Sequence, residues 1–525
     1  MRAVRRKAAV ALLLVALLGS GRGLAARQDA LAGFDAYVSS GLDAWRIPGL
    51  AVAVVKDGRV VHLRGYGVRE LGRPERVDEH TLFAIGSTTK AMTAALVGML
   101  VDEQKLAWDD PVTRHLPSFQ LRDPAVTREL TVRDLLTHRA GLGNADFLWY
   151  GQEHTTADIL QRVRLLEPAY SLRSRFIYQN VMYAAAGQVI EQVTGQSWAD
   201  VIRTRIFEPL GMRDSRATLR LVPRDANVAA PHAVVAGRVK VVQNMSVDSV
   251  AAAGSVWSSA RDMSLWLQFV LAGGHAGGAG GKRLLSERTY AELFRPQAFV
   301  PDTQYPTTQL VKPHWMTYGL GWFQQDYRGR AVDFHTGSID GMIAIAGLVR
   351  DERLGVLVLG NLSGGELRHA LMYDVFDRYA GTRDRDWSAA LLKLYGDIRD
   401  RQAQAQARTE AQRVTGTAPS RPLQEYAGTY IDPLRGTVVV SADGDGLTIR
   451  YGTAFSGVLE HWHYNTFRAV WAADWRGTAL VNFTLAPATG RPESLEFQGA
   501  RFVRTAAGER GTRQDDQALP LAARR

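Results

Sequence analysis

Residues 87–90 (STTK) are the first place in this 525-residue sequence where side-chain types and spacing suggest chemistry. They follow a strand-like segment and open a stretch, residues 91–101, whose apolar residues recur at helical spacing. A serine at a helix N-terminus lies near unpaired backbone N–H groups, and a lysine three residues later lies on the same helix face. Burial lowers the pKa of a lysine, so the neutral amine of Lys90 could accept the proton of Ser87. The alternative is a capping serine followed by a solvated lysine.

Two further motifs occur once each, Tyr178-Gln179-Asn180 and His335-Thr336-Gly337. A phenol beside a cation can ionise below its usual pKa of ~10 and act as a general base, and a nearby asparagine can bond both a lysine and a substrate amide. The motif His335-Thr336-Gly337 ends an apolar strand. A hydrogen-bond donor, a hydroxyl and a glycine at that position suit a substrate-binding edge of a sheet. The alternatives are a buried tyrosine with an asparagine in a turn, and a satisfied histidine at a strand end.

With these three motifs in this order, the chain resembles the serine β-lactamase-like family. That family includes class C β-lactamases, DD-carboxypeptidases, related esterases and D-amino-acid peptidases. The resemblance covers roughly residues 30–400. Further stretches that match the pattern are Asp110-Pro111, Leu116-Pro117, Leu135-Leu136-Thr137-His138, Gly141-Leu142, Glu208-Pro209-Leu210-Gly211-Met212, Gly254-Ser255, Asp262-Met263 and Tyr318-Gly319-Leu320-Gly321-Trp322.

The resemblance implies a role for each motif. Ser87 would be the nucleophile that forms an acyl-enzyme, and Lys90 and Tyr178 would share proton transfer. Tyr178 would later activate water for deacylation, and Asn180 would orient the substrate amide. The backbone N–H groups of Ser87 and Ser338 would form the oxyanion hole.

The strand motif carries one departure from the family pattern. The resemblance makes His335, Thr336 and Gly337 substrate-binding residues together with Asn180. Penicillin-recognising and class C members usually have lysine at the position of His335, whereas histidine is common among esterase-like and peptidase-like relatives. A histidine can be neutral at pH 7, so the sequence favours an esterase or D-peptidase over an efficient β-lactamase.

The order of the predicted elements indicates an α+β fold. Asp57-Gly58 between residues 50–56 and 59–63 is a hairpin signal, and helical patterns dominate residues 130–270. Three later apolar runs, residues 332–337, 342–350 and 355–360, are typical of strands, and a closing helix is expected over 387–399. Helices between early and late strands imply one antiparallel sheet built from both ends of a domain. The β-lactamase/transpeptidase-like architecture, with an antiparallel sheet and a helical domain, is the fold that the resemblance implies.

The C-terminal part reads as a separate module. Residues 402–413 are polar and of low complexity, and Gly and Pro follow, so we expect a linker over 401–422. Six short strand patterns then recur about every ten residues, at 426–430, 437–441, 447–451, 466–470, 479–485 and 494–497. This spacing predicts a small all-β barrel or sandwich over 423–505, followed by a tail over 506–525. The barrel resembles the lipocalin-like domain that some family members carry.

The N-terminus is typical of export. Residues 1–7 are basic, residues 8–18 are apolar, and small residues follow, which predicts a secretory signal peptide over 1–26 and a hydrolase domain over 27–400. The alternative is a short membrane anchor, but a spanning helix needs about 20 apolar residues. We therefore expect a periplasmic or secreted bacterial protein with no stable membrane span after cleavage.

Composition and weaker motifs narrow the remaining classes. The chain has no cysteine, which excludes disulfides, thiol nucleophiles and cysteine–zinc sites. Its net charge of +10 is too dilute for a nucleic-acid partner. His461 and His463 lack an evident third metal ligand, Gly273–Gly281 fails the spacing of a phosphate loop, and Asp443–Gly446 fits a hairpin turn better than a calcium loop. No metal or organic cofactor is predicted.

The leading hypothesis is therefore an exported serine hydrolase. It would act through acyl-Ser87 on a small-molecule or peptide substrate: an ester, a β-lactam, or a D-amino-acid or peptidoglycan-type amide. The alternative from another class is a non-catalytic receptor for cell-wall peptides or β-lactams. A third hypothesis gives the barrel a role in specificity or assembly. The oligomeric state stays open.

Overall fold

The computed structural model describes residues 30–278, 280–444 and 446–505, and these fall into two compact units. The first unit contains residues 30–146 and 156–404, and the second contains residues 147–155 and those from 405 onward. The predicted signal peptide and C-terminal tail lie outside the described residues. Within the described part, no helix has both the length and the apolar character that crossing a bilayer requires.

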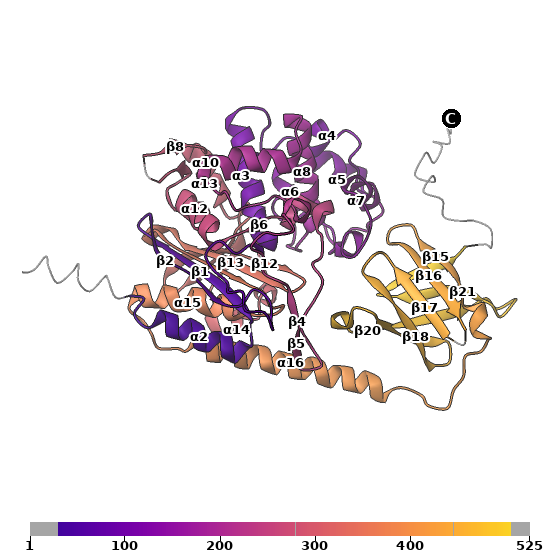
Figure 1. The fold of residues 1–525 in the computed structure, drawn as a ribbon. Coiled ribbons are helices and arrows are strands. Elements are labelled where there is room, and N and C mark those ends of the chain that lie inside the picture. Colours follow the sequence, from indigo (N-terminus) through magenta and orange to yellow (C-terminus); the bar gives the residue numbers. More distant parts are fainter. Residues whose placement is uncertain (1–29, 279, 445, 506–525) are drawn as a thin grey trace, which may run out of the picture. The chain divides into compact units, whose positions relative to one another are not determined.

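The first unit is built on one eight-stranded antiparallel sheet in the order β2-β1-β14-β13-β12-β11-β10-β9 (Figure 1). β1 pairs with β14 with Leu50 opposite Gly360, so both ends of the domain share one sheet, as the sequence predicted. The strands are β1 (Gly49–Lys56), β2 (Arg59–Gly67), β9 (Ala298–Phe299), β10 (Met316–Tyr318), β11 (Phe323–Tyr327), β12 (Arg330–Ile339), β13 (Met342–Val349) and β14 (Leu354–Gly360).

The predicted hairpin turn joins β1 to β2. Asp57 and Gly58 have φ angles of 52° and 77°, the left-handed backbone that a tight hairpin turn requires. In the interior of the sheet, β13 and β14 are buried along their whole length. A continuous apolar run is what a strand covered on both faces requires, and this explains why these segments do not alternate with polar residues.

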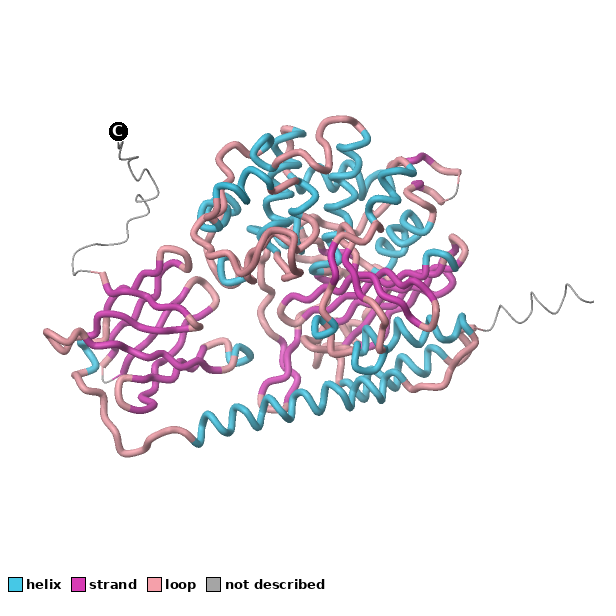
Figure 2. The backbone as a smooth tube through the Cα atoms, turned by 180° about the vertical axis from the view of Figure 1, so that it is seen from behind, coloured by secondary structure: helices cyan, strands magenta, loops and turns pink. Residues whose placement is uncertain are grey.

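Helices cover both faces of this sheet (Figures 1 and 2). α12 (Ala260–Leu271) packs on one face against β1 and β14, and α15 (Leu367–Ala380) packs on the other against β13 and β14. α2 (Phe34–Trp45) lies beside α15, and α3 (Thr89–Asp102) and α8 (Asn180–Thr194) lie in the layer of α12. The shorter helices are α4 (Val112–His115), α5 (Pro124–Glu129), α6 (Val132–Leu135), α7 (Thr156–Val163), α9 (Trp198–Ile202), α10 (Glu208–Leu210), α11 (Ala251–Gly254), α13 (Glu287–Leu293) and α14 (Thr308–Val311).

Three small two-stranded sheets complete the unit. The pairs are β3 (Phe83–Ala84) with β6 (Trp257–Ser258), β4 (His232–Val235) with β5 (Arg238–Val241), and β7 (His275–Ala276) with β8 (Lys282–Arg283). In the last pair, a strand within the glycine-rich stretch runs antiparallel to the strand that follows it, which differs from the strand-to-helix arrangement of a phosphate loop.

The last helix of the first unit differs from the prediction. α16 (Trp387–Ala411) continues twelve residues beyond the expected end at 399 and runs through the first half of the predicted linker. Its second half is exposed. Ala, Gln, Arg and Glu are strong helix formers, so a polar sequence of low complexity made from them forms a helix without a core to pack on. The boundary between the two units falls inside this helix, at residues 404 and 405.

The second unit is a closed antiparallel barrel in which the eight strands follow chain order. They are β15 (Gly428–Asp432), β16 (Gly436–Asp443), β17 (Gly446–Tyr451), β18 (Phe455–His463), β19 (Thr466–Trp471), β20 (Thr478–Leu485), β21 (Pro492–Phe497) and β22 (Ala500–Arg504). The six predicted strands are present. β18 and β22 were missed because charged and histidine residues interrupt their apolar pattern. Aromatic and aliphatic side chains such as Tyr430, Phe467 and Phe483 fill the interior.

A short excursion from the first half of the chain belongs to the barrel unit. Residues 147–155, which the sequence placed in the hydrolase domain, form their contacts with the barrel. The carbonyl of Gly151 accepts a hydrogen bond from Thr453 N (2.8 Å), and the hydroxyl of Tyr150 accepts one from Arg476 (2.8 Å). Tyr150 also packs beside Phe455. Nothing in the local sequence signals this exchange, because its partners lie about 300 residues away.

Candidate active site

Ser87 lies on a single 3₁₀ turn, Gly86–Thr88, between β3 and α3. Two glycines let this turn touch β12. A Cβ on Gly86, which has a φ of 51°, would lie 2.7 Å from the backbone nitrogen of Ser338, and a Cβ on Gly337 would lie 1.8 Å from the carbonyl oxygen of Ile85. The backbone nitrogens of Ser87 and Ser338 therefore lie around the same narrow contact. An oxyanion hole needs two such amides together.

Lys90 is fully buried one helical turn after Ser87. Its Nζ lies 2.9 Å from Ser87 Oγ and donates to Asn180 Oδ1 (2.7 Å) and to the carbonyl oxygen of Ala253 (2.8 Å). The partners at Asn180 and Ala253 are oxygens that can only accept. Two N–H groups of a neutral amine satisfy them, and the lone pair is then left facing the serine hydroxyl.

The surroundings of Lys90 favour that neutral amine. Burial lowers the pKa of Lys90 well below its usual value, and the charge of Asp146 only partly opposes the shift. The rings of Tyr178 and Tyr183 lie 4.8 and 5.2 Å from Nζ and exclude water around it. The sequence prediction that a buried lysine follows the serine on one helix face is confirmed.

Asn180 begins α8 and is held by a residue that the sequence did not single out. Its Nδ2 donates to Asp146 Oδ1 (2.9 Å), which turns the amide oxygen toward Lys90. Asp146 lies 34 residues before Asn180, where it begins a short 3₁₀ turn (Asp146–Leu148) that carries no sequence motif of its own. Only its neighbour Asn144, which caps the Asp146 N–H (3.0 Å), hints at a fixed turn there.

Tyr178 differs from the sequence expectation. Burial raises the pKa of Tyr178 well above its usual value, and the nearby Ser87 hydroxyl does not offset the rise. The cation of Lys90, which was expected to ionise the phenol, is itself disfavoured by the same burial. The phenol is therefore protonated at neutral pH, and it can relay a proton but does not rest as a phenolate. Its oxygen is buried without a hydrogen-bond partner among the described residues.

His138 positions the Tyr178 segment. Its ring stacks on that of Tyr178, with centroids 4.2 Å apart, and its Nδ1 accepts the backbone N–H of Gln179 (3.0 Å). Burial lowers the pKa of His138 well below its usual value, so the ring is neutral and can accept this bond. His138 belongs to a stretch that matched the family pattern, although the sequence gave it no role.

His335 is buried and neutral, with only 1% of its surface exposed. Its Nδ1 lies 2.7 Å from the carbonyl oxygen of Thr336, which can only accept, so Nδ1 carries the proton. Nε2 then accepts from the hydroxyl of Tyr318 (3.0 Å). Burial, with the charge of Lys90 adding to it, lowers the pKa of His335 to about 3. The histidine therefore offers a substrate no cation, in agreement with the expectation of a neutral ring at pH 7, and no free donor, which corrects the expectation of a donating side chain.

Thr336 is paired with a tyrosine. Its hydroxyl lies 2.9 Å from that of Tyr305. Of the predicted site residues, Ser87, Lys90, Asn180 and Tyr178 come together directly through these contacts. Gly337 and Ser338 meet them through the backbone, and the side chains of His335 and Thr336 are engaged elsewhere.

The weaker candidates form no second chemical site. His461 Nε2 lies 3.0 Å from the carbonyl oxygen of Tyr464, and His463 Nδ1 accepts from Val414 N (3.2 Å). Among the residues that the structure describes, no group of three or more His, Asp or Glu side chains is arranged to hold a metal ion. Asp443 ends β16 and Gly446 begins β17, as a hairpin turn requires.

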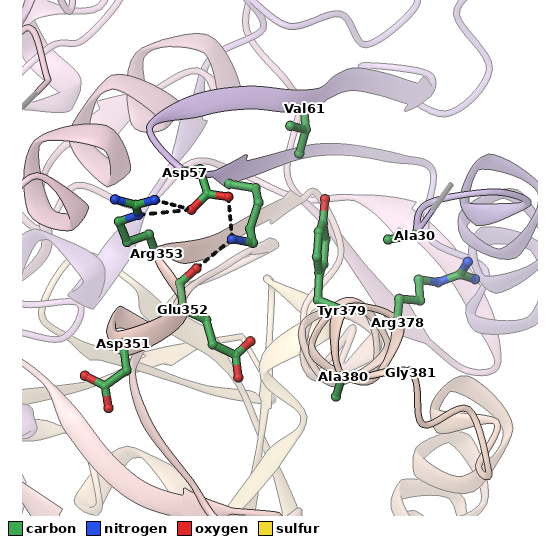
Figure 3. A pocket seen from close by; sticks show the side chains of 11 residues that line it. Ala30, Asp57, Val61, Asp351, Glu352, Arg353, Arg378, Tyr379, Ala380 and Gly381 are labelled. Atoms are coloured by element: carbon green, nitrogen blue, oxygen red, sulfur yellow. Dashed lines mark hydrogen bonds and ion pairs between the residues drawn. The ribbon is translucent and has the colours of Figure 1, made fainter. Parts of the chain in front are cut away.

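A separate hollow of about 960 Å³ lies at the β1–β2 turn and the end of α15 (Figure 3). Asp57 there accepts hydrogen bonds from Lys56 (2.7 Å) and Arg353 (2.8 Å), and Lys56 also donates to the carbonyl of Glu352 (2.9 Å). Its polar groups thus bind one another, and none of the predicted catalytic residues lines it.

Comparisons with known proteins agree with this geometry. A family model described as Beta-lactamase matches residues 34–377, and a domain of unknown function (DUF3471) matches residues 412–513. The chain is 30% identical to the Unguisins hydrolase ungD of Aspergillus violaceofuscus, over 88% of this chain and 87% of that one.

Solved structures support the same fold. The octameric penicillin-binding protein homologue from Pyrococcus abyssi is 22% identical with a TM-score of 0.60, over 90% of this chain and all of that one. A D-stereospecific amidohydrolase from Streptomyces sp. is 23% identical with a TM-score of 0.53, over 66% of this chain and 99% of that one. The α+β fold with an antiparallel sheet and a helical layer is confirmed.

Proposed function

Because the chain belongs to the beta-lactamase family of serine hydrolases, we propose that it is an exported enzyme that works through an acyl-Ser87 intermediate. The proposed substrates are esters and amides of D-amino acids or peptidoglycan-type peptides, in preference to β-lactams. One observation carries the proposal. The fully buried Nζ of Lys90 lies 2.9 Å from Ser87 Oγ, while two acceptor-only oxygens fix its remaining N–H groups.

Acylation follows from this placement. Neutral Lys90 takes the proton of Ser87 as Oγ bonds to the substrate carbonyl carbon. The carbonyl oxygen becomes an alkoxide between the N–H groups of Ser87 and Ser338, which stabilise it more than the neutral carbonyl. When the intermediate collapses, the bond to the leaving alcohol or amine breaks. Tyr178 gives its proton to the leaving group and recovers one from the Lys90 ammonium.

Deacylation reverses these transfers. Water replaces the leaving group and attacks the acyl carbon. Its proton passes through Tyr178 to Lys90, and the same two amides hold the second alkoxide. The ester bond to Ser87 then breaks, Oγ recovers the proton from Lys90, and the carboxylic acid leaves. Each residue ends in its starting protonation state, so one site serves both half-reactions.

The state of His335 supports the substrate class. A β-lactam or a free C-terminal peptide carries a carboxylate, which a lysine at this position would attract. The buried ring of His335, whose pKa is about 3, is neutral at pH 7 and does not attract a carboxylate. The group facing this strand edge in the substrate is therefore proposed to be uncharged. The relatives named above, a hydrolase and a D-stereospecific amidohydrolase, agree with hydrolysis of a D-amino-acid derivative.

Intact-protein mass spectrometry tests the proposal. Wild type and Ser87→Ala are incubated briefly with a fluorophosphonate, with a penicillin, and with p-nitrophenyl esters of N-acetyl-D-alanine and N-acetyl-L-alanine. We expect one fluorophosphonate adduct on wild type only, and faster release of p-nitrophenol from the D-ester. Absence of both the adduct and turnover would contradict the enzyme proposal. A stable penicilloyl adduct without ester turnover would favour the receptor alternative. The mass of the N-terminus recovered after expression in a bacterium tests export.

A further inference from the structure

A buried charged cluster lies at the start of α15, across the sheet from the helix that carries Lys90 (Figure 1). Its members are Glu366, Arg368 and His369, which are 8%, 5% and 1% exposed. Arg368 bonds both carboxylate oxygens of Glu366, with Nη2 to Oε1 at 2.8 Å and Nε to Oε2 at 3.1 Å. His369 Nδ1 lies 2.7 Å from the same carboxylate. No part of the proposed mechanism uses these residues.

One nitrogen of the cluster, Nη1 of Arg368, reaches the sheet. Arg368 Nη1 donates to the carbonyl oxygen of Gly337 (2.6 Å) and to Ser338 Oγ (2.9 Å), and it lies 3.2 Å from the carbonyl oxygen of Ala344. Gly337 and Ala344 are directly opposite each other on β12 and β13. The guanidinium therefore binds across the strand pair at the residues that touch the Ser87 turn.

The carbonyl of Gly337 and the N–H of Ser338 belong to one peptide group. A donor on the oxygen withdraws electron density from the amide, which makes its N–H a stronger donor on the opposite side. A charged guanidinium has a larger effect than a neutral donor. We propose that Arg368, held in place by Glu366, is a positioning residue that polarises and orients the Ser338 N–H of the oxyanion hole. This inference rests on the proposed serine hydrolase function.

The partners of Arg368 hold its side chain in one orientation. Two of its nitrogens bind the Glu366 carboxylate, so the side chain cannot rotate without breaking two charge-assisted bonds. Glu366 is in turn bound by His369 and stays ionised. Burial opposes ionisation of Glu366, but the charge of Arg368 and the bond from His369 outweigh it and lower the pKa of Glu366 to about 2. The third nitrogen thus stays directed at Gly337.

The test compares two buried arginines of α15. Arg368→Met removes the donor to Gly337. Arg378→Met is the matched control, because Arg378 is also buried, also pairs with an acid of the same helix, Asp374, and bonds the carbonyl of Ala32 rather than β12. For each variant, kcat and KM are measured on a neutral N-acetyl-D-alanine ester and on its thiono ester, in which sulfur replaces the carbonyl oxygen. Sulfur is a weaker hydrogen-bond acceptor, so the oxo-to-thiono rate ratio reports how strongly the reaction depends on the oxyanion hole.

We expect Arg368→Met to lower kcat about 10-fold with little change in KM, less than the ~10²–10³-fold cost of deleting an oxyanion donor outright. Its oxo-to-thiono ratio should fall several-fold, whereas Arg378→Met should keep the wild-type ratio even where its melting temperature falls as far. An unchanged ratio in Arg368→Met would overturn the inference. If that variant does not fold, Arg368→Lys decides by the same ratio, because an ammonium cannot bind Glu366 at two points and Gly337 at once. A wild type inactive on both esters would contradict the proposed function and this inference with it.

Discussion

Two buried basic side chains, Lys90 and Arg368, lie on either side of the reacting serine, and their surroundings differ in charge. Lys90 contacts three uncharged groups, the Ser87 hydroxyl, the Asn180 amide and the Ala253 carbonyl, and the Asp146 carboxylate binds the Asn180 amide. Arg368 has a carboxylate bound at two points. Both side chains are removed from water. The difference lies in whether burial is compensated by an opposite charge.

That difference decides what each cation can do. Uncompensated burial disfavours the ammonium, so Lys90 is ready to take a proton and give it back. A guanidinium paired with a carboxylate keeps its charge, so Arg368 provides a constant field and a constant donor. The Lys90 side of the site thus transfers protons, whereas the Arg368 side keeps a fixed charge and a fixed hydrogen bond. The predictions below test this division.

Exchanging the lysine for arginine should have the largest effect. Lys90→Arg keeps a cation on the same helix face, but a guanidinium does not release its proton, so the general base is lost. We expect kcat/KM on the D-alanine ester to fall at least ~10³-fold. Steady-state kinetics with a thermal unfolding control measure it. Arg368→Lys, the reverse exchange, should lose no more than the about 10-fold in kcat expected for Arg368→Met. Equal losses in Lys90→Arg and Arg368→Lys would contradict the division.

Removing the phenol hydroxyl should have the next largest effect. Tyr178→Phe keeps the ring that stacks on His138 and lies over Lys90. It deletes an oxygen that is buried without a partner among the described residues, so the melting temperature should not fall. We expect a loss of about 10²-fold in kcat, since proton relay to the leaving group is interrupted. The loss should be smaller for a p-nitrophenyl ester than for an anilide, because p-nitrophenolate leaves without a proton.

The proton-transfer side of the site was predictable from sequence because it is local. Ser87 and Lys90 are three residues apart at a helix start, and Tyr178 and Asn180 are two apart before another helix. Short spacing fixes such groups on one face or at one turn before tertiary structure is known. The sheet built from both chain ends was predictable for another reason, because helical patterns lie between the early and late strand patterns.

The Arg368 side of the site was not predictable from the sequence. Arg368 is one of many arginines, and its role depends on Gly337 lying 31 residues away on a strand that packs under α15. Asp146 and the barrel-bound segment after it are likewise defined by partners distant in sequence. The neutral states of Lys90 and His335 were expected, but the protonated phenol of Tyr178 and the engaged donor of His335 were missed. The expected phenolate at Tyr178 and donor at His335 ignored burial, which pattern alone does not reveal.

Lys90 and the Glu366–Arg368 pair should affect the free energy of unfolding in different pH ranges. Lys90 is neutral in the folded state, while its unfolded pKa is ~10.4. Between those pKa values the unfolded chain binds more protons, so unfolding free energy should rise with pH by up to ~1.4 kcal/mol per unit relative to Lys90→Met. Urea unfolding at pH 8, 9 and 10 measures this. A constant difference between the two proteins would show that Lys90 is charged when folded.

The ion pair between Glu366 and Arg368 should make the free energy of unfolding depend on pH only in the acidic range. The pKa of Glu366 is about 2 when folded and ~4.3 when unfolded, so its contribution is complete above pH ~4.3 and is lost as pH falls toward 2. The advantage of wild type over Glu366→Gln should therefore be constant from pH 5 to 8 and narrow below pH 4. An advantage that changes between pH 5 and 8 would place the titration elsewhere.

Removing the remote acid of the lysine should have the smallest effect. The charge of Asp146 raises the pKa of Lys90 against the larger effect of burial. Asp146→Asn removes that charge and keeps an oxygen for the Asn180 amide. The pKa of Lys90 should fall further, so the acidic limb of the kcat/KM profile should move to lower pH, by less than about one unit, with only a few-fold loss at its maximum. A shift to higher pH would mean that the limb belongs to another group. The same profile for Arg368→Met should keep its wild-type limb, because an arginine that only fixes a peptide takes no part in the titration.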